Sequence, residues 1–250
     1  DFDKPEYAAR RQRLMARIPD GIAVVLGSLA GPMNNEFIQN NEFVYLCGVK
    51  LPRAVLIVDG MRKESLLFFS PSENYLRNEG LSLDFVRDPR GATGVERVHP
   101  SADLMKVLAE RAVGAKAIYT PLTPEGPPQE VATDSALDGR LTRERQLALK
   151  LGELFPALEV RDCTGLLWEL RRIKTPAEIE VMREAGRISV EAMIEVMKAA
   201  RVGQAEFELS AVFEYVCKRQ GCRRVFDYNV IISSAENHPY LHYNRHDRTL

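Results

Sequence analysis

The sequence predicts an α/β domain with a parallel or mixed sheet, followed by the opening part of a second, α+β domain. Short β-branched and aromatic runs alternate with helical segments over roughly the first 170 residues. A charged segment at 171–176 then interrupts this alternation, and longer helices follow it. A chain of 250 residues that is 45% hydrophobic is long enough to bury two cores. We therefore expect domains at 1–172 and 173–250, the second of them incomplete.

The expected elements of the first domain follow from hydrophobic periodicity and from the turn residues at their ends. Helices are expected at 5–18, 101–113, 141–154 and 166–171. Strands are expected at 22–26, 43–47, 54–58, 65–69, 117–119 and 158–160. Four prolines and a glycine between 121 and 134 indicate an exposed excursion.

The second domain begins with a clear helix start. Thr175 suits an N-cap, Pro176 the first helical position, and Glu178 completes a capping box. The helix is expected to bury one stripe of apolar and small residues. Its members are Ile179, Met182, Gly186, Ser189, Met193, Val196 and Ala200. A second helix at 205–219 and a strand at 228–232 follow, and the apolar stripes should drive oligomerisation if no sheet covers them.

Composition narrows the class of protein. The formal net charge of −1 argues against a nucleic-acid binder, and the apolar runs are strand-sized, too short to cross a membrane. Cysteine spacing favours four reduced thiols in a cytoplasmic protein, with a disulfide between Cys217 and Cys222 as the alternative. The chain starts at Asp1 without methionine, so we expect that an upstream segment has been removed.

Three segments, in this order, carry a resemblance to a known family. They are NNEFVYLCGVKLPRAVLIV at 40–58, LRRIKTPAEIEVMREAGRIS at 170–189 and FDYNVIISSAENHPYLHY at 226–243. Together they resemble the Xaa-Pro aminopeptidase and prolidase family. The resemblance implies a creatinase-like N-terminal domain followed by a partial pita-bread metallopeptidase domain.

The resemblance also implies an activity, the release of a peptide's first residue when proline follows it. Members of this family use two divalent ions, manganese or otherwise zinc or cobalt, to activate a water. Their acidic ligands lie beyond the segment that resembles 226–243, so no metal ligand is expected within this chain. We expect an inactive fragment of a protein that forms a dimer or tetramer. A prolidase, a metal-free creatinase-like hydrolase and a non-catalytic binding module remain alternatives.

Two residues are predicted at the substrate site from the same resemblance. His242 matches a histidine that contacts substrate, where an imidazole N–H can stabilise a developing oxyanion. Tyr228 matches a tyrosine near the substrate pocket, although a buried strand tyrosine explains it nearly as well.

Other polar residues are expected to be structural. The spacing of His238, His242 and His246 suggests a metal-binding helix face, but Pro239 disfavours a helix there. Asn40, Asn41 and Tyr45 are expected to support a turn and a strand, with a role in a neighbouring subunit's active site as the alternative. His99 is expected in a loop.

Overall fold

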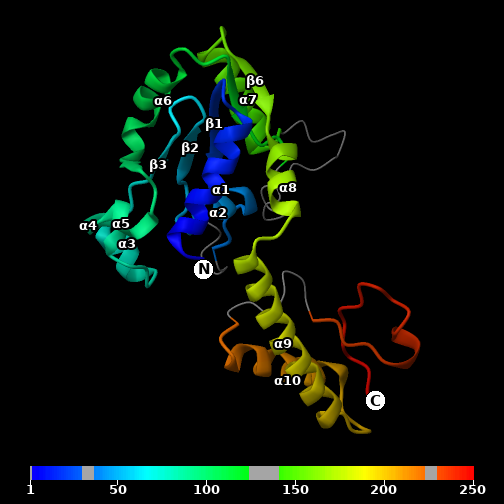
Figure 1. The fold of residues 1–250 in the computed structure, drawn as a ribbon. Coiled ribbons are helices and arrows are strands. Elements are labelled where there is room, and N and C mark those ends of the chain that lie inside the picture. The colour runs from blue at the N-terminus through cyan, green and yellow to red at the C-terminus, as the bar shows by residue number, and fades with distance from the viewer. Residues whose placement is uncertain (1, 30–36, 124–140, 223–229) are drawn as a thin grey trace. The chain divides into compact units, whose positions relative to one another are not determined.

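The computed structural model describes residues 2–29, 37–123, 141–222 and 230–250 (Figure 1). It divides into two compact units, Asp1–Ile173 and Lys174–Leu250, called here the N-terminal and C-terminal units. The assignment of 1–172 as a whole domain and of 173–250 as an incomplete one stays a prediction.

The described residues of the N-terminal unit form one six-stranded sheet, which is mixed, one of the two kinds that the sequence predicts. Its strands are β1 (Gly21–Leu26), β2 (Val55–Asp59), β3 (Glu64–Phe68), β4 (Arg97–His99), β5 (Ala117–Thr120) and β6 (Glu159–Asp162). They lie in the order β4-β3-β2-β1-β5-β6. Neighbours are parallel except at β1–β2 and β2–β3, which are antiparallel. Gly21 is required at the start of β1, because a Cβ there would lie 2.2 Å from the Ala117 carbonyl oxygen.

Helices cover both faces of this sheet. They are α1 (Lys4–Arg17), α2 (Asn41–Cys47), α3 (Glu73–Asn78), α4 (Asp84–Arg87), α5 (Pro89–Thr93), α6 (Leu104–Ala112), α7 (Arg143–Leu154) and α8 (Thr164–Arg172), with a 3₁₀ turn η1 (Ser101–Asp103).

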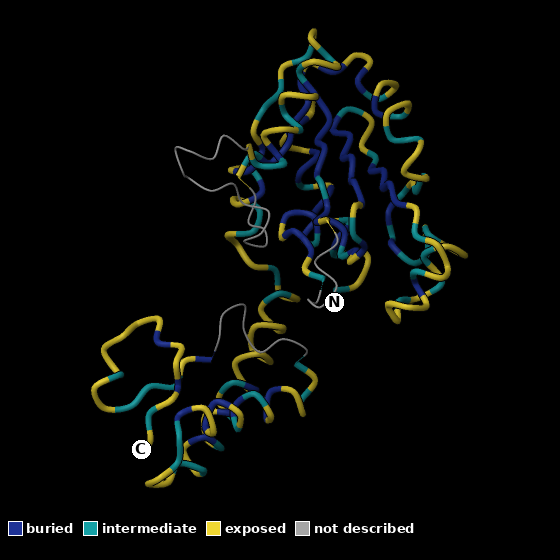
Figure 2. Tube along the Cα trace, turned by 180° about the vertical axis from the view of Figure 1, so that it is seen from behind, coloured by how far each residue is buried: buried dark blue, intermediate teal, exposed yellow. Residues whose placement is uncertain are grey.

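Alternate residues of β1 enter two separate apolar cores. Ala23 and Val25 pack with residues of α1, α2 and α8, whereas Ile22 and Val24 pack with residues of α6 and α7. A strand buried on both faces has a continuous apolar sequence, which explains why the run at 22–26 is detectable. Figure 2 shows the central strands as buried along their length.

The expected strand at 43–47 is wrong, because this segment forms helix α2. Phe43, Leu46 and Cys47 are all buried, a spacing that suits one face of a helix. Gly48 ends the helix in a left-handed conformation (φ 68°), and its N–H bonds to the Val44 carbonyl. The prediction for His99 is also wrong, since His99 lies in β4 and stacks on Phe68 with 5.3 Å between ring centroids.

The C-terminal unit contains two long helices and a tail. They are α9 (Pro176–Ala199) and α10 (Glu206–Arg219), and the tail carries the 3₁₀ turn η3 (Ala235–Asn237). Both halves of the predicted capping box are present: Thr175 accepts from the Glu178 N–H, and Glu178 accepts from the Thr175 N–H.

The predicted stripe on α9 is mostly exposed. Ile188, Ala192 and Val196 pack with Leu209 and Phe213 of α10 instead. Ile179, Met182, Gly186 and Met193 are exposed and Ser189 is half-buried, so only Val196 of the predicted stripe is fully buried in this core. The physical reason is that the small residues Ala192 and Ala199 allow α10 to approach a neighbouring face of the helix.

The strand expected at 228–232 falls partly outside the described residues. Its described part, 230–232, is not a strand. Val230 nevertheless enters the core of the C-terminal unit, and the Ile232 N–H bonds to the ring of His246. Val230 and Ile232 therefore pack against side chains of the helices, whereas Ile231 is exposed.

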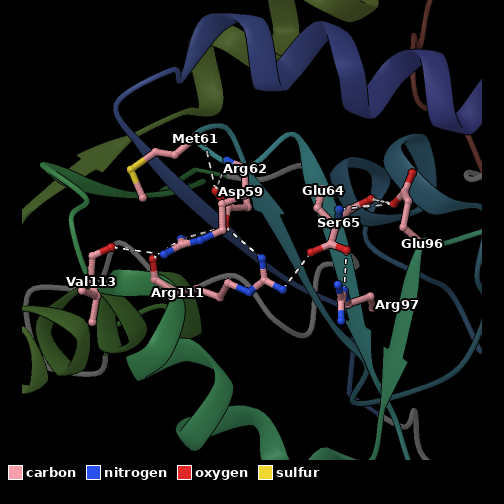
Figure 3. Close-up of polar contacts among 9 residues, drawn as sticks. All are labelled: Asp59, Met61, Arg62, Glu64, Ser65, Glu96, Arg97, Arg111 and Val113. Atoms are coloured by element: carbon pink, nitrogen blue, oxygen red, sulfur yellow. Dashed lines mark hydrogen bonds and ion pairs between the residues drawn. The ribbon is translucent and has the colours of Figure 1, made fainter.

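A buried charge network joins β2, β3 and α6 (Figure 3). Asp59 is 0% exposed, and its Oδ1 accepts from the backbone N–H groups of Met61 and Arg62 at 3.1 and 2.8 Å. Its Oδ2 pairs with Arg62 at 3.1 Å and with Arg111 at 3.4 Å. Arg111 also binds Glu64 at 2.8 Å, so α6 is bound to the edge of the hairpin formed by β2 and β3.

Burial by itself would raise the pKa of Glu64 in this network. Hydrogen bonds from Arg97 and Arg111 outweigh burial and lower that pKa. Glu64 thus carries its negative charge near neutral pH, and the contacts of the network bind α6 to β2 and β3. We assign it a structural role.

Candidate functional site

The tail that follows α10 carries the predicted substrate histidine and is bound to the start of that helix. Glu206 N–H bonds to the Arg248 carbonyl and Phe207 N–H to the His246 carbonyl, both at 2.9 Å. The Gly203 N–H bonds to the Leu250 carbonyl at 3.0 Å, the Leu250 N–H bonds in return to the Gln204 carbonyl at 2.8 Å, and Ala205 forms a bridge with Thr249. The first N–H groups of a helix lack partners within it, so these carbonyls satisfy donors that would otherwise need water.

Glu206 is the centre of the tail's side-chain contacts. It is 0% exposed. Its Oε1 accepts from the N–H and hydroxyl of Ser234 at 2.7 and 2.6 Å. Its Oε2 accepts from the Tyr243 hydroxyl at 2.7 Å, and Asn237 donates to that hydroxyl at 3.0 Å. A carboxylate with three such donors is a well-satisfied buried anion.

The electrostatics of this carboxylate follow from its partners. Burial alone would raise the pKa of Glu206, but the hydrogen bonds from Ser234 and Tyr243 outweigh it and lower that pKa. Its position in the first turn of α10 also favours a negative charge. Burial, and then the hydrogen bond to Glu206, raise the pKa of Tyr243. The phenol therefore stays protonated and donates a hydrogen bond to Glu206.

His242 directly precedes this anchored tyrosine and is itself exposed. Among the described residues it has no hydrogen-bond partner for its side chain. The backbone is thus held on one side by Tyr243, while the imidazole remains accessible. This arrangement suits a residue that meets a ligand.

The two other histidines of the tail lie in different surroundings. His238 is exposed, whereas His246 is 9% exposed and packs edge-on against Tyr243 at 5.7 Å between centroids. Nε2 of His246 accepts from the Ile232 N–H at 3.4 Å. No cluster of three His, Cys, Asp or Glu residues able to hold a metal occurs within the described ranges.

Tyr228, the second predicted substrate residue, lies outside the described residues. Asn40 and Tyr45 have structural contacts in the N-terminal unit. The Asn40 amide donates to the Leu26 carbonyl at 3.1 Å, and the Tyr45 hydroxyl donates to the Leu170 carbonyl at 3.1 Å. Asn41 is exposed at the first position of α2.

All four cysteines are free, including Cys217 and Cys222, which pack in the apolar core of the C-terminal unit. Burial raises the pKa of Cys47 to about 12, so its thiol is inert. In the part of the chain that the structure describes, no helix has the length and apolar character needed to span a bilayer.

Two protein-family models match the chain in sequence. The model for the aminopeptidase P N-terminal domain matches residues 7–119, and the model for metallopeptidase family M24 matches residues 180–250. The chain belongs to the Xaa-Pro aminopeptidase and prolidase family. The two matched regions fall in the N-terminal and C-terminal units respectively, and the family is one of metal-dependent peptidases.

Curated members of this family align with nearly the whole chain. Xaa-Pro aminopeptidase 3 of Rattus norvegicus is 27% identical over 98% of this chain and 50% of its own length. Xaa-Pro aminopeptidase of Escherichia coli (strain K12) is 26% identical over 99% of this chain and 56% of its own length. The chain therefore spans about half the length of these relatives.

Solved structures show the same fold. A putative aminopeptidase P from Bacillus anthracis matches all of this chain and 59% of its own, with a TM-score of 0.82 and 22% identity. Aminopeptidase P from E. coli in its low-pH form matches with a TM-score of 0.76 and 23% identity, over 57% of its chain. At such identities these structures support the fold alone.

The anchoring residues Glu206, Ser234 and Tyr243 were not predicted from the sequence. The sequence pattern indicates only an ordinary acidic residue in the first turn of a helix at Glu206, and only a turn residue at Ser234. Tyr243 gave the only signal, because it follows His242 within the segment that carries the family resemblance.

Proposed function

We propose that this chain is part of an Xaa-Pro aminopeptidase, which releases the first residue of a peptide when proline follows. The observation that carries this proposal is the order of the two family matches, an aminopeptidase P N-terminal domain before an M24 domain. Alignment of relatives named Xaa-Pro aminopeptidase over 98–99% of this chain supports it further.

His242 is the proposed substrate-contacting residue. In hydrolysis of the bond before proline, the carbonyl oxygen of the first residue gains negative charge as water adds to its carbon. An imidazole N–H placed beside that oxygen would stabilise the charge. The exposed side chain of His242 is available for this contact, and Glu206 holds the neighbouring Tyr243 in place. Tyr228 is proposed as a second substrate contact.

The proposed enzyme uses two divalent metal ions, manganese or otherwise zinc or cobalt. A structure titled as a zinc-substituted E. coli aminopeptidase P with product bound supports divalent metal for that protein. The described residues of this chain supply no group of three His, Cys, Asp or Glu residues that fits such a site. We therefore assign no step to metal here, and we propose that these 250 residues alone are inactive.

A peptidase assay tests both parts of the proposal. The full-length protein should release the first residue of an Xaa-Pro-Yaa tripeptide with manganese present, and the 250-residue chain should not. His242→Ala in the full-length protein should lower kcat roughly 100-fold, the scale of losing one oxyanion donor. His238→Ala, which removes another exposed histidine of the same tail, should leave kcat within twofold.

The results separate the alternatives. Tripeptide hydrolysis that is insensitive to a chelator would favour a metal-free creatinase-like hydrolase. An inactive full-length protein would favour a non-catalytic binding module. Equal losses in the two histidine variants would refute the role of His242. Turnover by the 250-residue chain would refute its inactivity.

A prolidase is the second candidate, and one local match favours it. Xaa-Pro dipeptidase of Homo sapiens is 44% identical over 86 residues, which cover 33% of this chain and 17% of the relative. Prolidases cleave Xaa-Pro dipeptides, so the comparison of a dipeptide with a tripeptide of the same first residue decides between the two. A preference for the dipeptide would reject the aminopeptidase.

Association with a second copy is also proposed. The exposed apolar residues of α9, among them Met182, Val190 and Met197, are 58%, 61% and 66% exposed. Large apolar side chains gathered on one helix favour burial against another surface. A monomeric mass for the 250-residue chain by light scattering would contradict this proposal.

A further inference from the structure

A groove of about 400 Å³ opens in the N-terminal unit. It lies between the turn that precedes β2 and the segment that follows β3. Its residues include Leu51, Arg53, Phe69, Tyr75 and Ser101. Leu51 and Phe69 are 1% and 6% exposed and form an apolar floor. The volume is within the range of pockets that hold small molecules.

Arg53 is the only charged residue among those that line the groove. Its backbone has φ +59°, in the left-handed region, directly after Pro52. A proline followed by a residue of positive φ is the pattern of a type II turn, which favours glycine at this second position. Arginine is therefore strained where glycine would be relaxed, and such strain is concentrated at functional sites.

The Arg53 guanidinium is exposed and has no hydrogen bond or ion pair with any residue that the structure describes. Its backbone N–H is used, since it bonds to the Ser28 carbonyl at 2.8 Å. The turn is thus held by the main chain, while the side chain contributes nothing to the fold. A cation at the mouth of an apolar groove is then free to bind a ligand.

Two serine hydroxyls of the groove are further hydrogen-bond donors, in addition to the Arg53 guanidinium. Ser70 Oγ accepts from the Ser101 N–H at 2.9 Å, and Ser72 Oγ accepts from the Tyr75 N–H at 3.1 Å. Each hydroxyl uses its lone pairs in this way and keeps its own hydrogen to donate. Burial, followed by the charge of Glu79, raises the pKa of Tyr75, so that phenol also remains a donor.

We propose that this groove binds a carboxylate carried on a small apolar body. Arg53 would pair with the carboxylate, the hydroxyls of Ser70 and Ser72 would donate to its oxygens, and Leu51 and Phe69 would contact the apolar part. A guanidinium matches the planar carboxylate with two parallel hydrogen bonds. One cation beside an apolar floor suits a monoanion better than inorganic phosphate, which carries more charge and no apolar surface.

The probe is N-acetyl-leucine, titrated into the ¹⁵N-labelled 250-residue chain and followed by amide NMR. We expect saturable shifts at Arg53, Ser70, Ser72 and Ser101. N-acetyl-leucinamide, which has the same body without the charge, should bind at least tenfold more weakly, as expected when a charge-assisted hydrogen bond is lost. Inorganic phosphate should give no saturable shift at these amides.

Arg53→Gly tests the assigned cation without endangering the fold, because glycine adopts φ +59° without strain. It should weaken N-acetyl-leucine binding at least tenfold while the remaining spectrum is retained. Lys63→Gly is the matched control. Lys63 also has positive φ (+55°), lies at the other end of β2, and does not line the groove. Its substitution should leave binding within twofold.

Three results would overturn the proposal. They are the absence of saturable shifts with N-acetyl-leucine, equal binding of the amide, and unchanged binding by Arg53→Gly. Saturable binding of phosphate alone would assign the groove to a different anion and would overturn the carboxylate as well.

Discussion

Replacement of Asp59 by asparagine should destabilise the N-terminal unit by about 3 kcal/mol, the lower end of the range for breaking a buried ion pair. Asp59 is 0% exposed and is the shared partner of Arg62 and Arg111 (Figure 3). Asparagine has the same shape and can still accept from the N–H groups of Met61 and Arg62. The variant therefore removes the charge and leaves the turn after β2 intact.

The magnitude follows from what remains after the substitution. With the asparagine oxygen kept on those N–H groups, its NH₂ group would face the two guanidinium groups, from which it cannot accept a hydrogen bond. Breaking a buried pair by removing one partner costs about 3–5 kcal/mol. Arg62 and Arg111 have side chains that are 39% and 14% exposed, so water partly replaces the lost carboxylate. The expected loss in the free energy of unfolding therefore lies at the lower end of that range.

Urea unfolding is the assay, followed by the fluorescence of Trp168, the only tryptophan of the chain, in α8. With a slope of about 2 kcal/mol per M, the midpoint should fall by roughly 1.5 M. Glu73→Gln is the control, because Glu73 and Arg77 form an ion pair whose side chains are 47% and 60% exposed. Such exposed pairs contribute about 0.5 kcal/mol or less. Equal midpoints for the two variants would refute the structural role of the network.

Two further predictions concern the tail of the C-terminal unit. Tyr243→Phe removes a hydrogen-bond donor to Glu206 and should speed hydrogen exchange of the Glu206 and Phe207 amides roughly tenfold. Tyr240→Phe is the control, because Tyr240 is 64% exposed, and it should leave these rates unchanged. Equal exchange rates in the two variants would contradict the anchoring of the tail by Tyr243. Because the pKa of Glu206 lies below its ordinary value of 4.5, its stabilising contribution is complete above that pH and is lost as pH falls through the folded-state pKa. Protection of these amides should therefore decline in acid below about pH 4.5 in the wild type and stay flat in Glu206→Gln, and a decline shared by both would reject this assignment.

Elements that are buried on both faces or capped by local residues could be predicted from the sequence. The runs at 22–26 and 54–58 lie within a residue of β1 and β2, because burial on both sides leaves them uniformly apolar. The start of α9 was also predictable, since Thr175 and Glu178 form the capping box within a single turn.

Segments whose conformation depends on distant contacts were not predictable in the same way. The run at 43–47 is apolar and rich in strand formers, and a stretch this short does not distinguish helix from strand. Long-range contacts favour the helix, because Gln39 bonds to the Val49 and Leu51 carbonyls at 3.0 and 3.1 Å and holds the chain on both sides of α2.

The contacts that anchor the tail likewise join residues that are far apart in the sequence. Glu206 meets Ser234 and Tyr243 across 28 and 37 residues of chain, and no local pattern encodes such a pairing. A single sequence reveals which residues are polar. It does not reveal which of them share a buried site.

The central position of β1 has a consequence for the order of events during synthesis. One edge of β1 pairs with β2, which follows soon in the chain, but the other pairs with β5, whose residues 117–120 are made much later. A nascent chain that has already formed β1, β2 and β3 therefore presents a row of unpaired N–H and C=O groups along β1, which is an edge strand until β5 is added. Open edges of this kind promote pairing with other chains. The number of residues between β3 and β5 determines how long the edge of β1 stays unpaired during synthesis.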